Sequence, residues 1–208
     1  MLLTLPQMLA LTAQCAPAIA PETLMSVVQV ESGFDPLAIG VNGKPRITVN
    51  ATTRPEAVSK ASALIAAGRS VDLGLAQINS KNLRWLGLSV EDAFDPCRNL
   101  AAAARVLRGG YDVNQASALG EQQALRVALS RYNTGDAARG FDNGYVAKVV
   151  SASARVVPAI QPTPGVPPKA AEPPPSRPAW DVFGQTGRPA DFVIRVSTSA
   201  PTSNGDRK

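Results

Sequence analysis

One carboxylate stands out by its position on a predicted helix. Leu24, Val27, Val28 and Glu31 recur at the spacing of one helical face, so Glu31 shares that face with three aliphatic side chains. Burial disfavours the charged form of a carboxyl group and raises its pKa. A carboxyl group that stays protonated near neutral pH can act as a general acid toward a glycosidic oxygen. The alternative is a last-turn glutamate that reaches solvent or meets an arginine.

Further polar side chains suit contacts with sugar hydroxyls and amides. Gln77 and Asn79 share one side of a predicted extended stretch, which follows a glycine that permits an unusual backbone or a close approach by a ligand. Tyr132 and Asn133 lie at the end of a predicted helix, and Tyr145 lies at the start of another, where its hydroxyl could steady a carboxylate. Each also has a plain structural interpretation: a self-capping loop, a helix end, or the edge of the core.

Composition excludes the commoner chemistries. The 208 residues include no histidine, which excludes Ser-His-Asp and Cys-His arrangements and histidine-ligated metals. Two cysteines, Cys15 and Cys97, are too few for a structural zinc site, and no Gly-rich phosphate-binding motif occurs, so we expect no metal and no cofactor. The formal charge of +5 suits an anionic partner, but no basic cluster with interleaved aromatics predicts nucleic-acid binding. The cysteines could form a disulfide worth roughly 4 kcal/mol, or remain two buried thiols.

The first 20 residues are largely apolar, yet they do not match a secretory signal. The first basic residue of the chain is Lys44, whereas a signal peptide needs a positively charged start. Two prolines interrupt the segment, which is too short to cross a membrane. We expect Pro6 to Cys15 to be a helix of the folded domain, without stable membrane insertion, and the export route stays open.

The pattern along the chain predicts a mostly helical α+β domain with one small β-hairpin. Residues 39–48 have the pattern of a hairpin with Asn42-Gly43 as a two-residue turn, and Thr53 with Glu56 forms a capping-box signature. Asp95 and Pro96 are suited to open a long helix. The expected helices cover residues 6–15, 21–32, 53–67, 82–86, 95–109, 121–132 and 143–157, with a turn capped at 89–92 and an extended or looped stretch at 71–79.

Proline usage divides the chain after the last predicted helix. Residues 1–158 are expected to form the folded domain, and residues 159–178 form a Pro-rich linker, which such a composition makes stiff and extended. Residues 179–208 are a short tail, too poor in apolar residues for a core of its own. Its aromatic segment Trp180–Phe183 predicts either a flexible partner-binding tail or incidental aromatics.

Taken in order, these motifs resemble the catalytic domain of the soluble lytic transglycosylases, which has a lysozyme-like (goose-type) fold. The resemblance covers residues 10–157 and rests on Glu31-Ser-Gly-Phe, residues 74–79, residues 128–135, and Tyr145-Val. Other segments resemble the lytic transglycosylases of Vir-type type IV secretion systems. These segments are Cys-Ala-Pro at 15–17, Val-Gln-Val-Glu-Ser at 28–32, Asp-Pro-Cys at 95–97, Tyr-Asn-Thr-Gly-Asp at 132–136, Gly-Tyr-Val at 144–146, and the Pro-rich linker with Trp-Asp-Val-Phe at 180–183.

The resemblance implies a substrate and a mechanism. Glu31 would cleave the β-1,4 bond between N-acetylmuramic acid and N-acetylglucosamine in peptidoglycan, acting as acid and then as base to give a 1,6-anhydro product. The residues implied to bind sugar or to orient Glu31 are Ser32, Gln77, Asn79, Tyr132, Asn133 and Tyr145, of which Asn133 and Tyr145 are expected nearest the carboxyl group.

The same resemblance implies a disulfide, a compartment and partners. It implies that Cys15 pairs with Cys97 and so pins the N-terminal helix to the core. The chain would act in the Gram-negative periplasm, where it opens the wall for a type IV secretion or conjugation apparatus and contacts its components through the tail.

Two alternative functions remain open. The first is a muramidase on the same fold, in which Asp72 or Asp35 activates water. The second is a non-catalytic wall-binding assembly factor.

Overall fold

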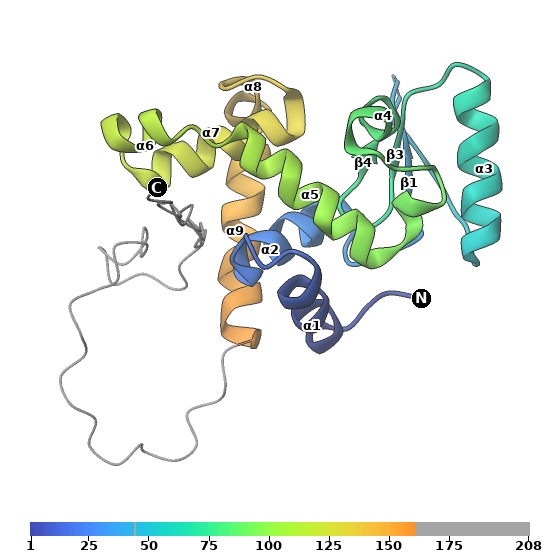
Figure 1. Cartoon of the computed structure of the whole chain (residues 1–208), viewed down its shortest axis with the longest axis horizontal. Coiled ribbons are helices and arrows are strands. Elements are labelled where there is room, and N and C mark those ends of the chain that lie inside the picture. Colours follow the sequence, from blue (N-terminus) through green and yellow to red (C-terminus); the bar gives the residue numbers. More distant parts are fainter. Residues whose placement is uncertain (44, 161–208) are drawn as a thin grey trace, which may run out of the picture.

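A computed structural model describes residues 1–43 and 45–160, so the predicted tail at 179–208 and the predicted linker beyond residue 160 lie outside the described residues. The described chain is mostly helical, with one small antiparallel sheet at one end (Figure 1). This is the α+β lysozyme-like arrangement predicted from the sequence. None of the helices within these two ranges is long and apolar enough to cross a membrane.

The helical part is organised around two packed pairs. Helix α2 (Pro21–Glu31) packs against α9 (Tyr145–Ile160), and α5 (Pro96–Gly110) packs against α7 (Glu121–Thr134). Helix α1 (Leu5–Cys15) contacts α2, α5 and α9. As predicted, Asp95 is the N-cap of α5 and accepts a hydrogen bond from the Arg98 backbone N–H.

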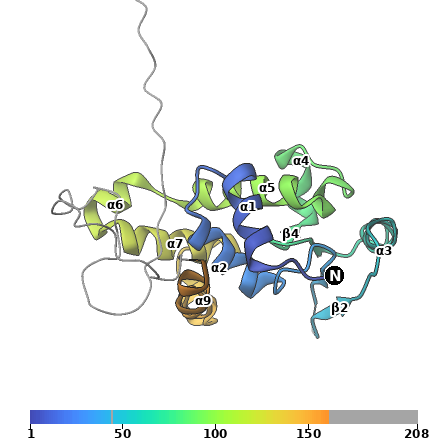
Figure 2. The same ribbon diagram turned by 90° about the horizontal axis from the view of Figure 1, so that it is seen from below.

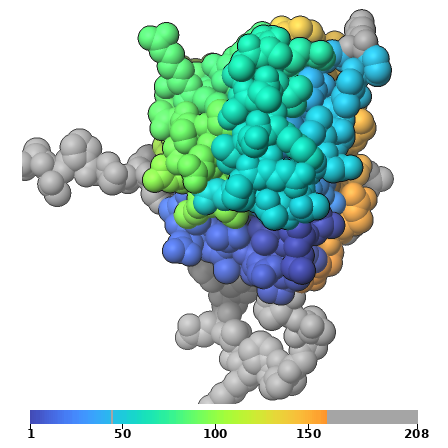
Figure 3. Space-filling view, turned by 90° about the vertical axis from the view of Figure 1, so that its right-hand side faces the viewer, coloured from blue at the N-terminus to red at the C-terminus, as the bar shows by residue number. Residues whose placement is uncertain are grey.

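The β part is a four-stranded antiparallel sheet rather than a lone hairpin. Its strands are β1 (Ile39–Val41), β2 (Ile47–Val49), β3 (Val71–Leu73) and β4 (Ile78–Asn79), in the order β2-β1-β3-β4. Helix α3 (Arg54–Ala66) contacts β3, and η1 (Ser80–Asn82), α4 (Leu83–Leu86) and η2 (Asp92–Phe94) follow the sheet. In the space-filling view of this end, α3 covers the centre of the face and α1 lies below it (Figure 3).

The predicted two-residue turn at Asn42-Gly43 is wrong. Val41 pairs with Ile47, so a longer loop joins the two strands. Asn42 instead donates its backbone N–H to the Ser70 carbonyl, at the edge of β3. A backbone contact to the neighbouring strand therefore overrides the local turn preference.

Other boundaries also differ from the prediction. The stretch 71–79 contains two strands and a turn, and α6 (Val113–Leu119) and α8 (Arg139–Asp142) were missed because they are short. Thr53 caps α3 by accepting the Glu56 N–H, but the Glu56 side chain bonds to Thr52 and Lys60, so only half of the predicted capping box forms. The pair Ser89 and Asp92 does form reciprocal capping bonds, as predicted.

Helix α2 is buried on more than its predicted face. Leu24, Val27 and Val28 have no exposed surface, as their spacing predicts, but Thr23 and Ser26 are equally buried. Ser26 satisfies its hydroxyl within the helix by donating to the Glu22 carbonyl. Because α2 lies inside the helical part, between α1 and α9 (Figure 2), it is a rigid mount for the residue at its C-terminus.

A disulfide joins Cys15 at the end of α1 to Cys97 in the first turn of α5. The two Cα atoms lie 5.2 Å apart, and the bond spans a sequence separation of 82 residues. The pairing implied by the resemblance is therefore present, and it ties α1 to the central helix.

Candidate active site

Glu31 is the last residue of α2, and the chain turns sharply immediately after it. Gly33 and Phe34 both have positive φ, at 62° and 71°. A bulky residue such as Phe34 rarely adopts this conformation, which costs free energy unless the surroundings enforce it. Here the Phe34 ring is buried, and its carbonyl accepts the Leu3 N–H. The turn ends the helix so that the Glu31 side chain projects into a cleft.

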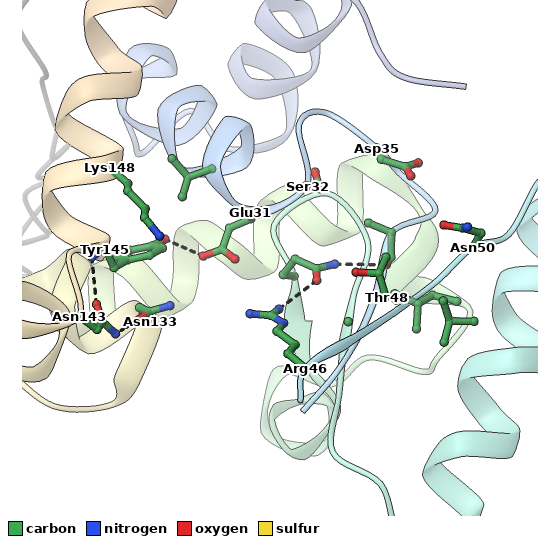
Figure 4. Close-up of a pocket in the computed structure, with 16 residues that line it drawn as sticks. Glu31, Ser32, Asp35, Arg46, Thr48, Asn50, Asn133, Asn143, Tyr145 and Lys148 are labelled. Atoms are coloured by element: carbon green, nitrogen blue, oxygen red, sulfur yellow. Dashed lines mark hydrogen bonds between the residues drawn. The ribbon is translucent and has the colours of Figure 1, made fainter. Parts of the chain in front are cut away.

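The Glu31 carboxylate is held by a tyrosine from the other side of the cleft. The Tyr145 hydroxyl donates to Glu31 Oε1 at 2.6 Å, from the first turn of α9 (Figure 4). Burial raises the pKa of Tyr145 well above its ordinary value, so its hydroxyl stays protonated and remains a donor. Asn143 sets this geometry, because its Oδ1 accepts the Tyr145 N–H and its Nδ2 donates to Asn133 Oδ1.

The surroundings raise the pKa of Glu31 from 4.5 to about 7. Burial is the largest cause, and the negative charge of Asp72 adds to it. The hydrogen bond from Tyr145 and the positive charge of Arg46 act in the opposite direction. Near neutral pH the carboxyl group is therefore divided between its acid and base forms, as a group that first gives and then takes a proton requires.

Replacing Tyr145 with phenylalanine should move the pH dependence of activity. The hydrogen bond favours the charged form of Glu31, so its loss raises the Glu31 pKa further and shifts the alkaline limb of the rate profile to higher pH. We also expect a rate about tenfold lower at neutral pH, because the carboxyl group loses a partner that orients it. The check is the rate of the reaction that the resemblance implies, cleavage of purified cell wall, measured across pH.

The matched control for this change is Tyr132→Phe. The Tyr132 hydroxyl donates to the Ala76 carbonyl at 2.7 Å rather than to Glu31. This variant should leave the alkaline limb in place. An unmoved limb in Tyr145→Phe would contradict the role given to Tyr145.

Asp72, the candidate second carboxylate, is already engaged by the protein. On β3, its Oδ2 accepts from Arg46 Nη2 at 3.1 Å, and its Oδ1 accepts from Asn79 Nδ2 at 2.7 Å. Asp35, the other candidate, accepts the Leu37 N–H through Oδ1. Both Asp72 oxygens therefore have donors, which disfavours it as a base that activates water.

Gln77 and Asn79 were predicted to share one side of an extended stretch, and this prediction is wrong. Gln77 lies in the turn before β4 with φ of 50°, and its Nε2 donates to the carbonyls of Ala38 and Gly74. Gly74 also has positive φ, and a Cβ there would overlap the Ala93 carbonyl oxygen. The close approach predicted at this glycine is thus made by the protein's own backbone.

A buried asparagine fixes this turn, and sequence reasoning missed it. Asn99 on α5 donates to the carbonyls of Leu73 and Ala93 and accepts the Ala76 N–H. Because Tyr132 donates to the Ala76 carbonyl, the backbone at Ala76 is held from both sides. The sequence does contain a signal for this role, because Asn99 is a polar residue on an otherwise apolar face of the helix.

The six residues predicted to bind sugar or to orient Glu31 all line the cleft. One hollow of about 590 Å³ is bordered by Ser32 and Tyr145, and a second of about 450 Å³ by Asn79 and Tyr132. The residues that border both hollows are Glu31, Arg46, Gln77 and Asn133. Glu31 therefore lies where the two hollows meet, with space for a ligand on both sides of its carboxyl group.

The six residues differ in how free they are to contact a ligand. Asn133 is exposed, whereas the Ser32 hydroxyl donates to the Val28 carbonyl and Asn79 holds Asp72. Tyr145 contacts the carboxylate as expected, and Asn133 reaches it only through Asn143 and Tyr145. Sequence reasoning missed Arg46 and Asn143, whose roles depend on contacts across the fold.

The described residues hold no group of three or more acidic, cysteine or histidine side chains that could bind a metal ion. The chemistry available in the cleft is that of one carboxyl group with a raised pKa, a tyrosine hydroxyl, and amides. This set suits proton transfer to and from an uncharged polar substrate.

Comparison with known proteins agrees with this geometry. Residues 8–150 match the transglycosylase SLT domain family. The chain is 42% identical to protein virB1 of Agrobacterium fabrum over 171 residues, which is 82% of this chain and 68% of that protein. It is 40% identical to the type IV secretion system protein virB1 of Brucella suis biovar 1 over 168 residues, 75% of this chain and 70% of that protein. No solved structure matches.

Proposed function

The chain belongs to the transglycosylase SLT family, and we propose that Glu31 serves this lytic transglycosylase as its single catalytic carboxylate, first as acid and then as base. The observation that carries the proposal is the placement of Glu31, with a pKa of about 7, at the junction of the two hollows. The substrate is a peptidoglycan glycan strand lying along the groove.

In the first step, protonated Glu31 donates its proton to the glycosidic oxygen while the bond from the muramoyl C1 to that oxygen breaks. The acetamido carbonyl oxygen of the same sugar attacks C1 and stabilises the positive charge that develops there. Substrate assistance of this kind replaces the nucleophilic carboxylate of two-carboxylate glycosidases. It fits a cleft in which both oxygens of Asp72 are engaged by Arg46 and Asn79.

In the second step, the Glu31 carboxylate takes the proton of the muramoyl C6 hydroxyl. The C6 oxygen then attacks C1 and displaces the acetamido oxygen, which gives the 1,6-anhydro ring. No water is consumed, and Glu31 ends protonated and ready for the next cleavage. The hydrogen bond from Tyr145 steadies the carboxylate between the two steps.

The structure of the product tests this mechanism. Mass spectrometry of fragments released from purified wall should find 1,6-anhydromuramoyl ends, which are lighter by one water than hydrolysed ends. Reducing ends would favour the muramidase alternative, with Asp72 or Asp35 activating water. Absence of any released fragment would favour the wall-binding assembly factor.

The relatives give the proposed setting of this activity. Those from Brucella are named as type IV secretion system proteins. We propose that this chain likewise acts on the wall in the Gram-negative periplasm and opens it locally for assembly of a secretion or conjugation apparatus. The disulfide between Cys15 and Cys97 fits an oxidising compartment of this kind.

We further propose that the segment Trp180–Phe183 binds a component of that apparatus. The motivation is an aromatic cluster beyond a run of prolines in the sequence. Truncation after residue 160, where α9 ends, should leave wall cleavage unchanged but reduce substrate transfer in a conjugation assay. Unchanged transfer would argue against docking, and a loss of cleavage would place the tail in the catalytic unit.

A further inference from the structure

A side groove branches from the Glu31 cleft between α2 and α9. It has a volume of about 440 Å³ and is lined by Gln29, Val30, Ala147, Lys148, Ser151 and Arg155. Val30 and Lys148 also line the larger hollow beside Glu31. Figure 4 shows Lys148 and Tyr145 projecting from α9 on the same side of the cleft. The side groove therefore adjoins the hollow that contains Glu31 and shares two of its lining residues.

The charged side chains that line this groove are all positive. Lys148 and Arg155 are its charged residues, both are exposed, and its lining includes no acidic side chain. Within residues 1–43 and 45–160, neither forms an ion pair or a side-chain hydrogen bond. Two cations that have no partner among the described residues, beside the apolar side chains of Val30 and Ala147, favour a ligand that carries carboxylates.

From this groove we infer a second part of the substrate site, one that binds the peptide carried by the muramoyl residue. This inference rests on the proposed function, because peptidoglycan attaches a short peptide to the lactyl group of each such sugar. The peptide has free carboxylates, and it leaves the glycan strand next to the bond that is cut. A strand seated over Glu31 would thus place its peptide at the mouth of the side groove.

The dimensions of the groove agree with such a ligand. Lys148 and Arg155 lie two helical turns apart on one face of α9, which separates them by roughly 10 Å. That distance is about three residues of extended peptide. Ser151 lies between the two cations along α9, and Gln29 lines the groove from α2, so peptide carbonyls and N–H groups would also have partners. Lys148 would meet the carboxylate nearer the sugar and Arg155 the one farther along.

Binding measurements on the full chain test the inference without depending on turnover. The Glu31→Gln variant is titrated with glycan strands that carry their peptides, and with the same strands after an amidase has removed them. We expect the peptide-bearing strands to bind about fivefold more tightly, and the difference to shrink at high salt. Adding Arg155→Glu should abolish this preference while leaving affinity for the peptide-free strands unchanged.

The control is Arg108→Glu, an exposed arginine on α5 that lines neither the cleft nor the side groove. It should keep the full preference. Equal affinity for both strands, or an equal loss on both with Arg155→Glu, would overturn the inference. Cleavage products from the wild type report separately on the proposed function, so the two can fail independently.

Discussion

Replacing Glu31 with glutamine should lower the rate of wall cleavage by at least about a thousandfold, the upper range for loss of a general acid–base group. An amide of the same shape can neither protonate the glycosidic oxygen nor deprotonate the C6 hydroxyl, so both steps are lost together. Mass spectrometry of fragments released from purified wall, with wild type and variant in parallel, measures the effect. Wild-type rates in Glu31→Gln would overturn the assignment of Glu31 as the catalytic carboxylate, whereas the absence of cleavage by both proteins would favour the wall-binding assembly factor.

Asp72→Asn is the matched comparison for a second carboxylate. Because Arg46 and Asn79 occupy its two oxygens, we expect a smaller loss than for Glu31, arising from altered packing of the sheet beside the cleft. An equal loss in the two variants would instead indicate a carboxylate pair. Reducing ends in the wild-type products would accompany that outcome.

The same glutamine variant should be more stable than the wild type above neutral pH. The Glu31 pKa is about 7 in the folded protein against 4.5 ordinarily, so the folded state binds more protons between these values. Wild-type stability therefore falls as pH rises from about 4.5 to 7, by up to about 3 kcal/mol. Glu31→Gln removes this loss of stability. Unfolding in urea at several pH values should therefore show that the free energy of unfolding depends less on pH in the variant than in the wild type. An inactive variant that is also less stable at pH 8 would point to misfolding.

Replacing both Cys15 and Cys97 with alanine should lower the free energy of unfolding by roughly 4 kcal/mol. The bond closes a loop with a sequence separation of 82 residues, and its loss returns that conformational freedom to the unfolded chain. Since α1 packs against α2, which carries Glu31, we expect activity to disappear at a lower temperature than in the wild type. Thermal and urea unfolding measure the difference in stability.

Wild-type protein treated with a reducing agent is the control for this pair. It should unfold at nearly the same midpoint as the double variant, because both lack the same cross-link. A midpoint equal to that of the untreated wild type in both cases would show that the helical packing alone fixes α1.

Local patterns in the sequence determined which groups are present and on which elements they lie. The absence of histidine limited the chemistry to carboxyl groups, hydroxyls and amides. The spacing that placed Glu31 on an apolar helical face predicted its environment, because helical periodicity and the cost of burying charge are local properties. The proline and aspartate signals at the start of α5 likewise act on neighbouring residues alone.

Only the tertiary structure decided how these groups meet. Tyr145 reaches Glu31 across 114 positions of sequence, and Arg46 and Asn79 occupy Asp72 through the register of the sheet. The two-residue turn was wrong because the pairing of β1 with β3 outweighs a local turn preference. Likewise, α2 is buried on more than one face because helices distant in sequence surround it. Such contacts depend on the position of every element at once, and no short window of sequence contains them.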